Sequence, residues 1–556
     1  MFKENTKHLQ PALISEISQL PEKQLKLLKG SWADTFYHVF FIRIDEEIFA
    51  VLYSDKASRP NVSVNVLVGL EVLKAAFGWS DAELYENFCF NLQVRYALGY
   101  DRLGDGDFAI RTLYYFRERL SKYYLETGIN LLEQAFEHIT DAQILELQVH
   151  TGMQRMDSTQ IASNIVNASR LQLLVGAIQR VHRVMREMDQ NRLAESFAPY
   201  IKDTAGHYTY RVKGKEAVQE HLKQVGMVIY QLLTELKDAY GSEKAYQVLE
   251  RIFTENFNMI EHSVCPKENQ ELASSSLQSL DDLEASYRTK GNVHYKGYVA
   301  NITETCNPEN DLQLITKVQV APNNTDDSQL LAEALPNLQE RTDLDILMTD
   351  GGFGGEASDS ALEGQPVKLI QTAIRGRKPD PHKLHLSDFD IQFDQNGNPT
   401  RITCPNRQNV PITTARTTGL QAHFDPEICS ACPFQKDGRC RAKPQKRDKR
   451  FLLSFTLKQV KAAHRRKVFL EHNDSGQNLR AAIEATVRSI KHPFPAGKLP
   501  VRGQFRIASM VIASAIYVNV RRIWRYQVDQ VFSFIFSAIR KLFFASNTSD
   551  LLGFLQ

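Results

Sequence analysis

The chain has 556 residues, of which 43% are apolar and 24% are charged. This composition is that of a globular protein, and the length predicts two or three domains rather than one. The first ten residues lack the apolar region of a secretory signal, and the most apolar stretch, Ser509 to Val520, is shorter than the ~20 residues of a membrane span. A cytoplasmic protein with no membrane partner is therefore expected.

The net charge of +2 conceals a marked asymmetry along the chain. Residues 401–556 contain 27 Lys and Arg but 9 Asp and Glu, whereas the first 400 residues contain 40 and 56. The basic residues cluster at 443–450, 461–467 and 521–525, interleaved with aromatic residues. A solvated surface would explain a single run, but a basic block of this size favours a bound polyanion. A nucleic acid is therefore the expected partner, because such clusters commonly contact phosphates.

Residues 1–150 are predicted to be helical. Residues 62–77 repeat apolar side chains at helical spacing, and Ser80 with Glu83 forms a capping box that begins another helix. Short helices joined by glycine-containing turns are compatible with a helix-turn-helix DNA-binding domain and equally with any small helical bundle.

From residue 151 the pattern predicts a mixed α/β core that extends to 375 and carries a helical insertion at about 165–285. A helix is expected at 326–338. Strand-like runs lie at 153–165, 292–303, 312–322, 344–350 and 367–375. A Gly-, Pro- and Cys-rich insertion follows at 376–455, and helical periodicity resumes over 456–556 as the C-terminal part of the core.

Two aspartates lie on the predicted strands. Asp350 ends the apolar run LDILMTD directly before GGFGGE, at the carboxyl edge of a strand, where open α/β sheets place their ligands. Asp157, in RMDSTQ, lies on the first strand of the same core. Each residue alone is equally typical of an ordinary turn or strand-end aspartate.

A third carboxylate lies in the helical sequence QNLRAAIEATVRSIK. Gln477, Arg480, Glu484, Arg488 and Lys491 are spaced by 3, 4, 4 and 3 residues and so share one helical face. A glutamate among cations can bind a metal ion beside a phosphate, although a solvated face with ordinary Glu–Arg pairs has the same pattern. Two aspartates and one glutamate suffice to hold the paired Mg²⁺ ions of phosphodiester chemistry.

These motifs resemble those of the bacterial insertion-sequence DDE transposases, which have an RNase H-like core. One branch of that family ends in Tyr-x2-Arg-x3-Glu-x6-Lys, and Arg480, Glu484 and Lys491 reproduce this spacing, with Gln477 in place of the tyrosine. The segments around Asp157 and Asp350 resemble the first two catalytic motifs. The sequence HYKGY at 294–298 and the C-terminal helix with Asn519 are also similar to the family.

The resemblance implies roles for these residues. Asp157, Asp350 and Glu484 would be catalytic and would bind Mg²⁺ or Mn²⁺, while Arg480, Arg488 and Lys491 would contact DNA. The enzyme would cleave the ends of its element and join the freed 3′-hydroxyls to target DNA. Its partner would be double-stranded DNA, and it would be associated with the nucleoid. Holding two ends together implies at least a dimer. A nuclease with the same fold, or a DNA-binding protein without catalysis, remains an alternative.

Four of the seven cysteines fall in the Cys-rich insertion, namely Cys404, Cys429, Cys432 and Cys440. A CxxC pair flanked by two further cysteines can close a tetrahedral zinc site, which this polar segment would need because it has little apolar material to bury. Four reduced, unliganded thiols are the alternative. His464 and His472 are alternative ligands.

Overall fold

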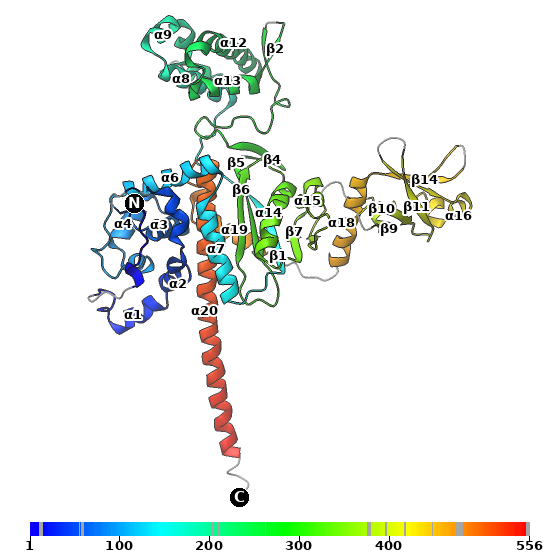
Figure 1. The fold of residues 1–556 in the computed structure, drawn as a ribbon. Coiled ribbons are helices and arrows are strands. Elements are labelled where there is room, and N and C mark those ends of the chain that lie inside the picture. Colours follow the sequence, from blue (N-terminus) through cyan, green and yellow to red (C-terminus); the bar gives the residue numbers. More distant parts are fainter. Residues whose placement is uncertain are drawn as a thin grey trace.

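The computed structural model describes residues 1–9, 15–54, 56, 60–201, 205–209, 211–261, 263–374, 380–394, 397–415, 419–446, 449–473 and 482–551. Figure 1 shows a central sheet beside a long C-terminal helix, with the N-terminal helices on the other side of that helix. Two further bodies project from the centre. One is helical and the other is built mostly of strands.

The N-terminal region is helical, as expected. Within the described residues of this region, the α-helices are α1 (Glu22–Lys29), α2 (Trp32–Val39), α3 (Val64–Phe77), α4 (Asp81–Phe90), α5 (Leu92–Ala97), α6 (Arg111–Thr127) and α7 (Leu131–Glu146). The predicted capping box begins α4, because Ser80 Oγ accepts from the Glu83 N–H at 3.2 Å and the Glu83 carboxylate accepts from the Ser80 N–H at 2.7 Å. Helix α3 is buried on nearly every side and ends at Gly78, whose φ of 68° terminates the helix in the left-handed conformation.

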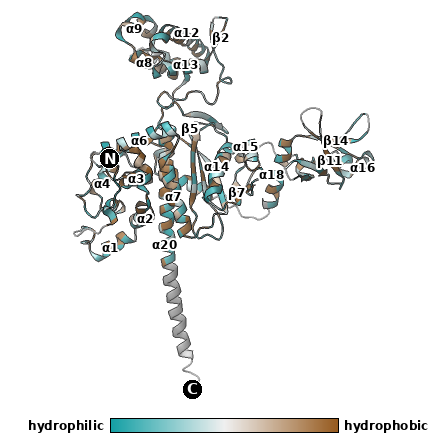
Figure 2. Cartoon of the chain, viewed as in Figure 1, coloured by the Kyte–Doolittle hydropathy of each residue, from teal (hydrophilic) through white to brown (hydrophobic). Residues whose placement is uncertain are grey.

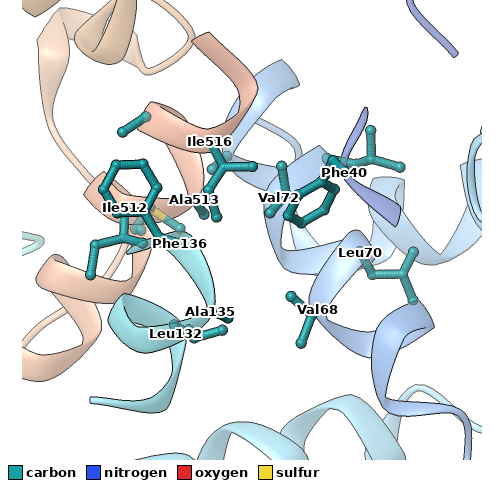
Figure 3. Packing of buried hydrophobic residues seen from close by; sticks show 14 of the residues in the cluster. Phe40, Val68, Leu70, Val72, Leu132, Ala135, Phe136, Ile512, Ala513 and Ile516 are labelled. Atoms are coloured by element: carbon teal, nitrogen blue, oxygen red, sulfur yellow. The ribbon is translucent and has the colours of Figure 1, made fainter. Parts of the chain in front are cut away.

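The N-terminal helices share one hydrophobic core with the C-terminal helix α20 (Gln504–Leu551). Figure 3 shows Val68 and Val72 of α3, Phe136 of α7 and Ile512 and Ile516 of α20 in this core. Figure 2 shows hydrophobic residues along α3, α7 and the enclosed part of α20. The segment 504–531 is long and apolar enough to cross a membrane by length and composition, but 67% of its apolar window is buried inside the protein. Packing within the chain therefore accounts for its apolar residues.

The central sheet is mixed. Strand β1 (Met153–Ile161) pairs antiparallel with β5 (Val293–Thr305) and parallel with β7 (Ile346–Thr349), which pairs parallel with β8 (Lys368–Gln371). On the other side, β5 pairs antiparallel with β4 (Ser286–Lys290) and β6 (Ile315–Pro322). Helix α14 (Asp327–Arg341) covers one face, where Met156 and Leu347 are buried with α14 leucines such as Leu331. The expected mixed α/β core is thus present.

The helical insertion between β1 and β4 has a hydrophobic core of its own. Its longer helices are α8 (Arg170–Val184), α12 (Lys215–Tyr240) and α13 (Lys244–Asn256). Its shorter elements are α9 (Glu187–Arg192), α10 (Ala194–Phe197), α11 (Ala205–Thr209), β2 (Phe257–Ile260) and β3 (Ser263–Pro266). Leu174, Ile229, Leu236 and Leu249 are completely buried in this second core.

The Cys-rich insertion forms a six-stranded antiparallel sheet, in the order β13-β14-β12-β11-β10-β9. Its elements are β9 (Asp390–Phe393), β10 (Pro399–Thr403), β11 (Asn409–Thr414), β12 (Leu420–Phe424), α16 (Pro426–Ala431), α17 (Pro433–Lys436), β13 (Lys443–Pro444) and β14 (Phe451–Phe455). The expectation that this segment has little apolar material to bury was wrong, because Phe389, Ile402, Phe424 and Phe455 form a core on one face. Only alternate strand residues contribute, so the apolar signal in the sequence is sparse.

Two helices connect this Cys-rich module to the rest of the protein. Helix α18 (Leu457–Asn473) packs against β8 of the central sheet and against the short helical turn η7 (Leu386–Asp388) of the module. Helix α19 (Ala482–Lys491) carries Glu484 and packs against β1 and α20. Arg480 and Gln477 lie outside the described residues.

Candidate active site

The two predicted aspartates belong to neighbouring parts of the central sheet. The parallel register of β1 and β7 ends with Arg155 beside Met348, and Asp350 directly follows β7, so the same register carried two residues further would place Asp157 beside Asp350. Aligned residues of neighbouring parallel strands project from the same face of a sheet. Asp157 is 8% exposed and Asp350 is half-buried. The sheet therefore supplies a pair of neighbouring, partly desolvated carboxylates.

The turn after β7 fixes Asp350. Its carboxylate accepts a hydrogen bond from the Gly352 N–H at 2.8 Å, and its backbone oxygen accepts one from Gln371 Nε2 at 3.1 Å. An Asp at the start of a tight turn commonly makes such a bond to the backbone two residues on. The glycine-rich sequence after Asp350 thus holds the carboxylate at the edge of the sheet.

Helix α19 lies on the face of β1 that carries Asp157. Lys491 Nζ donates to Thr159 Oγ1 at 2.5 Å, and Thr159 shares a face with Asp157 because side chains alternate along a strand. Ile483 and Ile490 are buried beneath the helix, while Glu484 is exposed. Glu484, Arg488 and Lys491 line one open hollow, so these three members of the predicted stripe share a surface. Burial lowers the pKa of Lys491.

A buried ionic network anchors this helix and was not found from the sequence. Glu304 on β5 is completely buried and lies 2.7 Å from both Arg155 Nε and Arg522 Nη2. Thr486 on α19 donates its hydroxyl to the same carboxylate at 2.7 Å. The network therefore joins α19, β1, β5 and α20 behind the candidate site. A glutamate within the apolar run VANITET was the only sequence signal for it.

A further carboxylate, Asp327, lies beside Asp350 and was also missed. It begins α14, accepts a hydrogen bond from Ser158 Oγ at 2.9 Å and forms an ion pair with Arg288 at 3.4 Å. Oxygen atoms of Asp327 and Asp350 lie 2.7 and 2.9 Å from the position that a Cβ atom on Gly352 would occupy. Gly352 therefore separates two carboxylates that a side chain would push apart. The run Asp326-Asp327-Ser328 predicts a helix cap, so the sequence gives no sign that Asp327 also lies beside Asp350.

The donor set at this edge fits a divalent cation in its chemistry. Carboxylate oxygens are the ligands that Mg²⁺ and Mn²⁺ prefer, and Asp157 and Asp350 offer them from adjacent strands. Within the described part of the chain, however, no group of three or more His, Cys, Asp or Glu side chains is in position to hold a metal ion. Glu484 is thus placed on the correct face of β1 but is not gathered with the aspartates into one cluster.

The four predicted cysteines of the Cys-rich module lie around one cavity, although within the described structure no three of them are in position to hold a metal ion. Cys404, Cys429, Cys432 and Cys440 line one cavity of about 20 Å³, and all four thiols are free. Gln408 Nε2 donates to Cys429 Sγ at 3.4 Å, and backbone groups of Ala442 and Arg441 hydrogen-bond to the Cys440 thiol. Burial, followed by the neighbouring thiols, raises the pKa of Cys429.

Of the two alternative histidines, the one whose side chain is described is not placed at these thiols. His464 lies on α18 with its ring against Phe393 and is not among the residues that line the thiol cavity. The side chain of His472 lies outside the described residues.

The chain is a mixed α/β protein, in which Asp157 and Asp350 belong to the central sheet region and the helix carrying Glu484 packs against β1. Residues 403–524 match the family model described as "Transposase DDE domain", which supports a DDE transposase and implies DNA as its partner. The matched segment includes the larger, C-terminal part of the Cys-rich module, Glu484 and Lys491, whereas Asp157 and Asp350 lie before it. Searches of curated proteins and of solved structures gave no match.

Proposed function

We propose that the protein is the DNA transposase of an insertion sequence, which cleaves the ends of its element and joins their 3′-hydroxyls to target DNA. The observation that carries this proposal is the parallel pairing of β1, which contains Asp157, with β7, which directly precedes Asp350, in a chain whose residues 403–524 match a transposase DDE domain. The packing of α19 against the same strand supports Glu484 as the third carboxylate.

Each residue has a defined part in the proposed reaction. Asp157, Asp350 and Glu484 would hold divalent cations, Mg²⁺ or Mn²⁺, and such ions activate an attacking oxygen and stabilise the leaving oxygen. Arg488 and Lys491, which flank Glu484 on one surface, would bind the phosphates on either side of the cleaved bond, together with Arg480. Because two DNA ends must be held together, the active form would be at least a dimer.

The test is a cleavage and strand-transfer assay on DNA that carries the ends of the element, with Mg²⁺, comparing wild type with Asp157→Asn, Asp350→Asn and Glu484→Gln. We expect wild type to produce joined DNA. Each variant should bind DNA but yield at least ~100-fold less product, because losing one metal-binding carboxylate disrupts the arrangement of both ions. Glu333→Gln, an exposed position on α14, is the matched control and should retain activity.

Three outcomes would contradict the proposal in different ways. Cleavage without joined products would indicate a nuclease. Binding without any cleavage by wild type would indicate a DNA-binding protein. Full activity in Glu484→Gln would mean that the third carboxylate lies elsewhere.

We further propose that the four thiols of the Cys-rich module bind one Zn²⁺ ion. Four cysteines around a single cavity are the ligand set of a structural zinc site, and backbone or amide N–H groups pointing at the sulfurs are typical of its surroundings. The ion would join β10, α16 and α17 to the loop before β13, which are otherwise held by a small core.

Metal analysis of the full-length protein tests this second proposal. We expect about one zinc per chain in wild type, loss of zinc in Cys432→Ser, and retention in Cys265→Ser, which alters a cysteine of the helical insertion. Unchanged zinc content in Cys432→Ser, or its absence from wild type purified with zinc present, would contradict the proposed ligand set.

A further inference from the structure

A cavity of about 480 Å³ lies between the sheet of the Cys-rich module and helix α18. Its walls come from the segment around η7, from β13 and β14, and from one side of α18. Leu384, Phe389, Leu453 and Phe455 form an apolar floor. None of the carboxylates of the candidate active site lines this cavity, and it shares Leu384 and Phe389 with the wall of the thiol cavity.

The charged residues that line this cavity are all basic. Arg441 and Lys443 enter from the strand side and Arg466 from α18, with His385 beside them, and none of the lining residues is Asp or Glu. Within the described part of the chain, the structure contains no ion pair for Arg441, Lys443 or Arg466. Three cations that line one cavity, with no Asp or Glu among its described lining residues, favour an anion there.

Other cations of the same helix differ in this respect. Lys461 pairs with Glu363 at 3.0 Å, Lys467 pairs with Asp390 at 2.9 Å, and Arg465 pairs with Asp359. The basic cluster at 461–467 is therefore largely neutralised by carboxylates, and Arg466 is its member that faces the cavity. The positive charge of Arg466 is therefore presented to the cavity, whereas the charges of its neighbours on α18 are paired with carboxylates.

We propose that this cavity binds the DNA backbone, with phosphate groups on Arg441, Lys443 and Arg466 and a sugar or base against the apolar floor. The inference rests on the proposed function, because it assumes that DNA is the substrate. The location supports it: α18 packs on β8, the strand next to β7, which leads to Asp350. DNA held at the candidate active site would thus have a second anchor on the Cys-rich module.

The test is the salt dependence of binding to a duplex of unrelated sequence, measured by fluorescence anisotropy without Mg²⁺. Removing one cation that binds a phosphate reduces the slope of log affinity against log salt by about 0.9. For Lys443→Gln with Arg466→Gln we therefore expect a slope less steep by about 2 and affinity lower by at least ~10-fold. The control, Lys461→Gln with Lys467→Gln, removes the same charge from paired positions and should leave the slope within about 0.5 of wild type.

Equal changes in both double variants, or an unchanged slope in the cavity variant, would overturn the proposal. The proposal would also be overturned if the cavity variant lost binding to a double-stranded RNA of the same length but retained its binding to DNA. Thermal denaturation of both variants ensures that folded proteins are compared. Because no cleavage is measured, this result is independent of the proposed reaction. A protein that fails to join DNA can still show the cavity-dependent slope, and a protein that joins DNA can lack it.

Discussion

Gly352 is the residue at which the smallest change should have the largest effect on activity. A Cβ atom there would come within 3 Å of oxygens of both Asp327 and Asp350. Because side-chain termini can move aside, we expect Gly352→Ala to remain folded while its carboxylates are displaced. Displacements near 1 Å cost up to ~100-fold in rate, so cleavage should fall by ~10–100-fold in the strand-transfer assay.

Gly104→Ala is the control for this experiment, because nothing lies within 4 Å of the Cβ atom that it would add. Equal activity of Gly352→Ala and wild type would show that the spacing of Asp327 and Asp350 is not critical.

Glu304 should matter to stability more than any exposed glutamate. Glu304→Gln would remove the negative charge that Glu304 places beside Arg155, which is itself nearly buried. Breaking a buried ion pair in this way typically costs about 3–5 kcal/mol. We expect this loss in the free energy of unfolding from urea denaturation, whereas the exposed Glu309→Gln should change it by less than about 0.5 kcal/mol. A loss below about 1 kcal/mol in Glu304→Gln would contradict the role of the network.

The sequence predicts the positions of some of the site residues but not the partners of others. Asp157 and Asp350 could be assigned to strand positions of one sheet from local pattern alone. Their mutual alignment could not, because it depends on the register of two strands separated by the whole helical insertion. Glu304 and Asp327 were missed because a glutamate in a strand and an aspartate at a helix start have common local explanations. Their partners come from distant segments.

Among the elements, helix α12 of the helical insertion contains an acid-sensitive position. His221 is buried against Tyr208, and its Nε2 atom has no hydrogen-bond partner among the described residues. Burial lowers the pKa of His221 below the ordinary value of about 6.5. The unfolded chain then binds a proton more readily than the folded one, so the stabilisation is complete above about pH 6.5 and is lost as the pH falls.

We therefore expect the free energy of unfolding of the helical insertion to fall between pH 7.5 and pH 5.5 in wild type. In His221→Gln it should fall by less. The measurement is the urea midpoint of the far-ultraviolet circular dichroism signal at the two pH values. An identical acid sensitivity in His221→Gln would assign the effect to other groups.

The elements themselves were predicted unevenly. Long helices such as α4 and strands such as β7 follow directly from capping and apolar runs. The sheet of the Cys-rich module was not anticipated, because its core draws on alternate residues of short strands and on the interrupted segments between them.

At the scale of the whole molecule, the helical insertion should unfold separately from the rest. Its hydrophobic core is distinct from the core shared by the N-terminal helices and α20. All three tryptophans, Trp32, Trp79 and Trp524, lie outside the insertion. In urea we therefore expect one transition by tryptophan fluorescence and two by circular dichroism, which also detects the insertion helices. Superimposable transitions by both probes would show that the two cores unfold together.

The shared core has a consequence for the order of events during synthesis. Helices α3 and α7 emerge from the ribosome early, but α20, which covers them, begins at Gln504. At ~5–20 residues per second, the wait lasts roughly 20–70 s. During that interval their apolar surface is open to chaperones and proteases. A messenger RNA truncated before the codons of α20 is therefore expected to yield chains that are degraded. Such fragments would not persist and compete for the ends of the element.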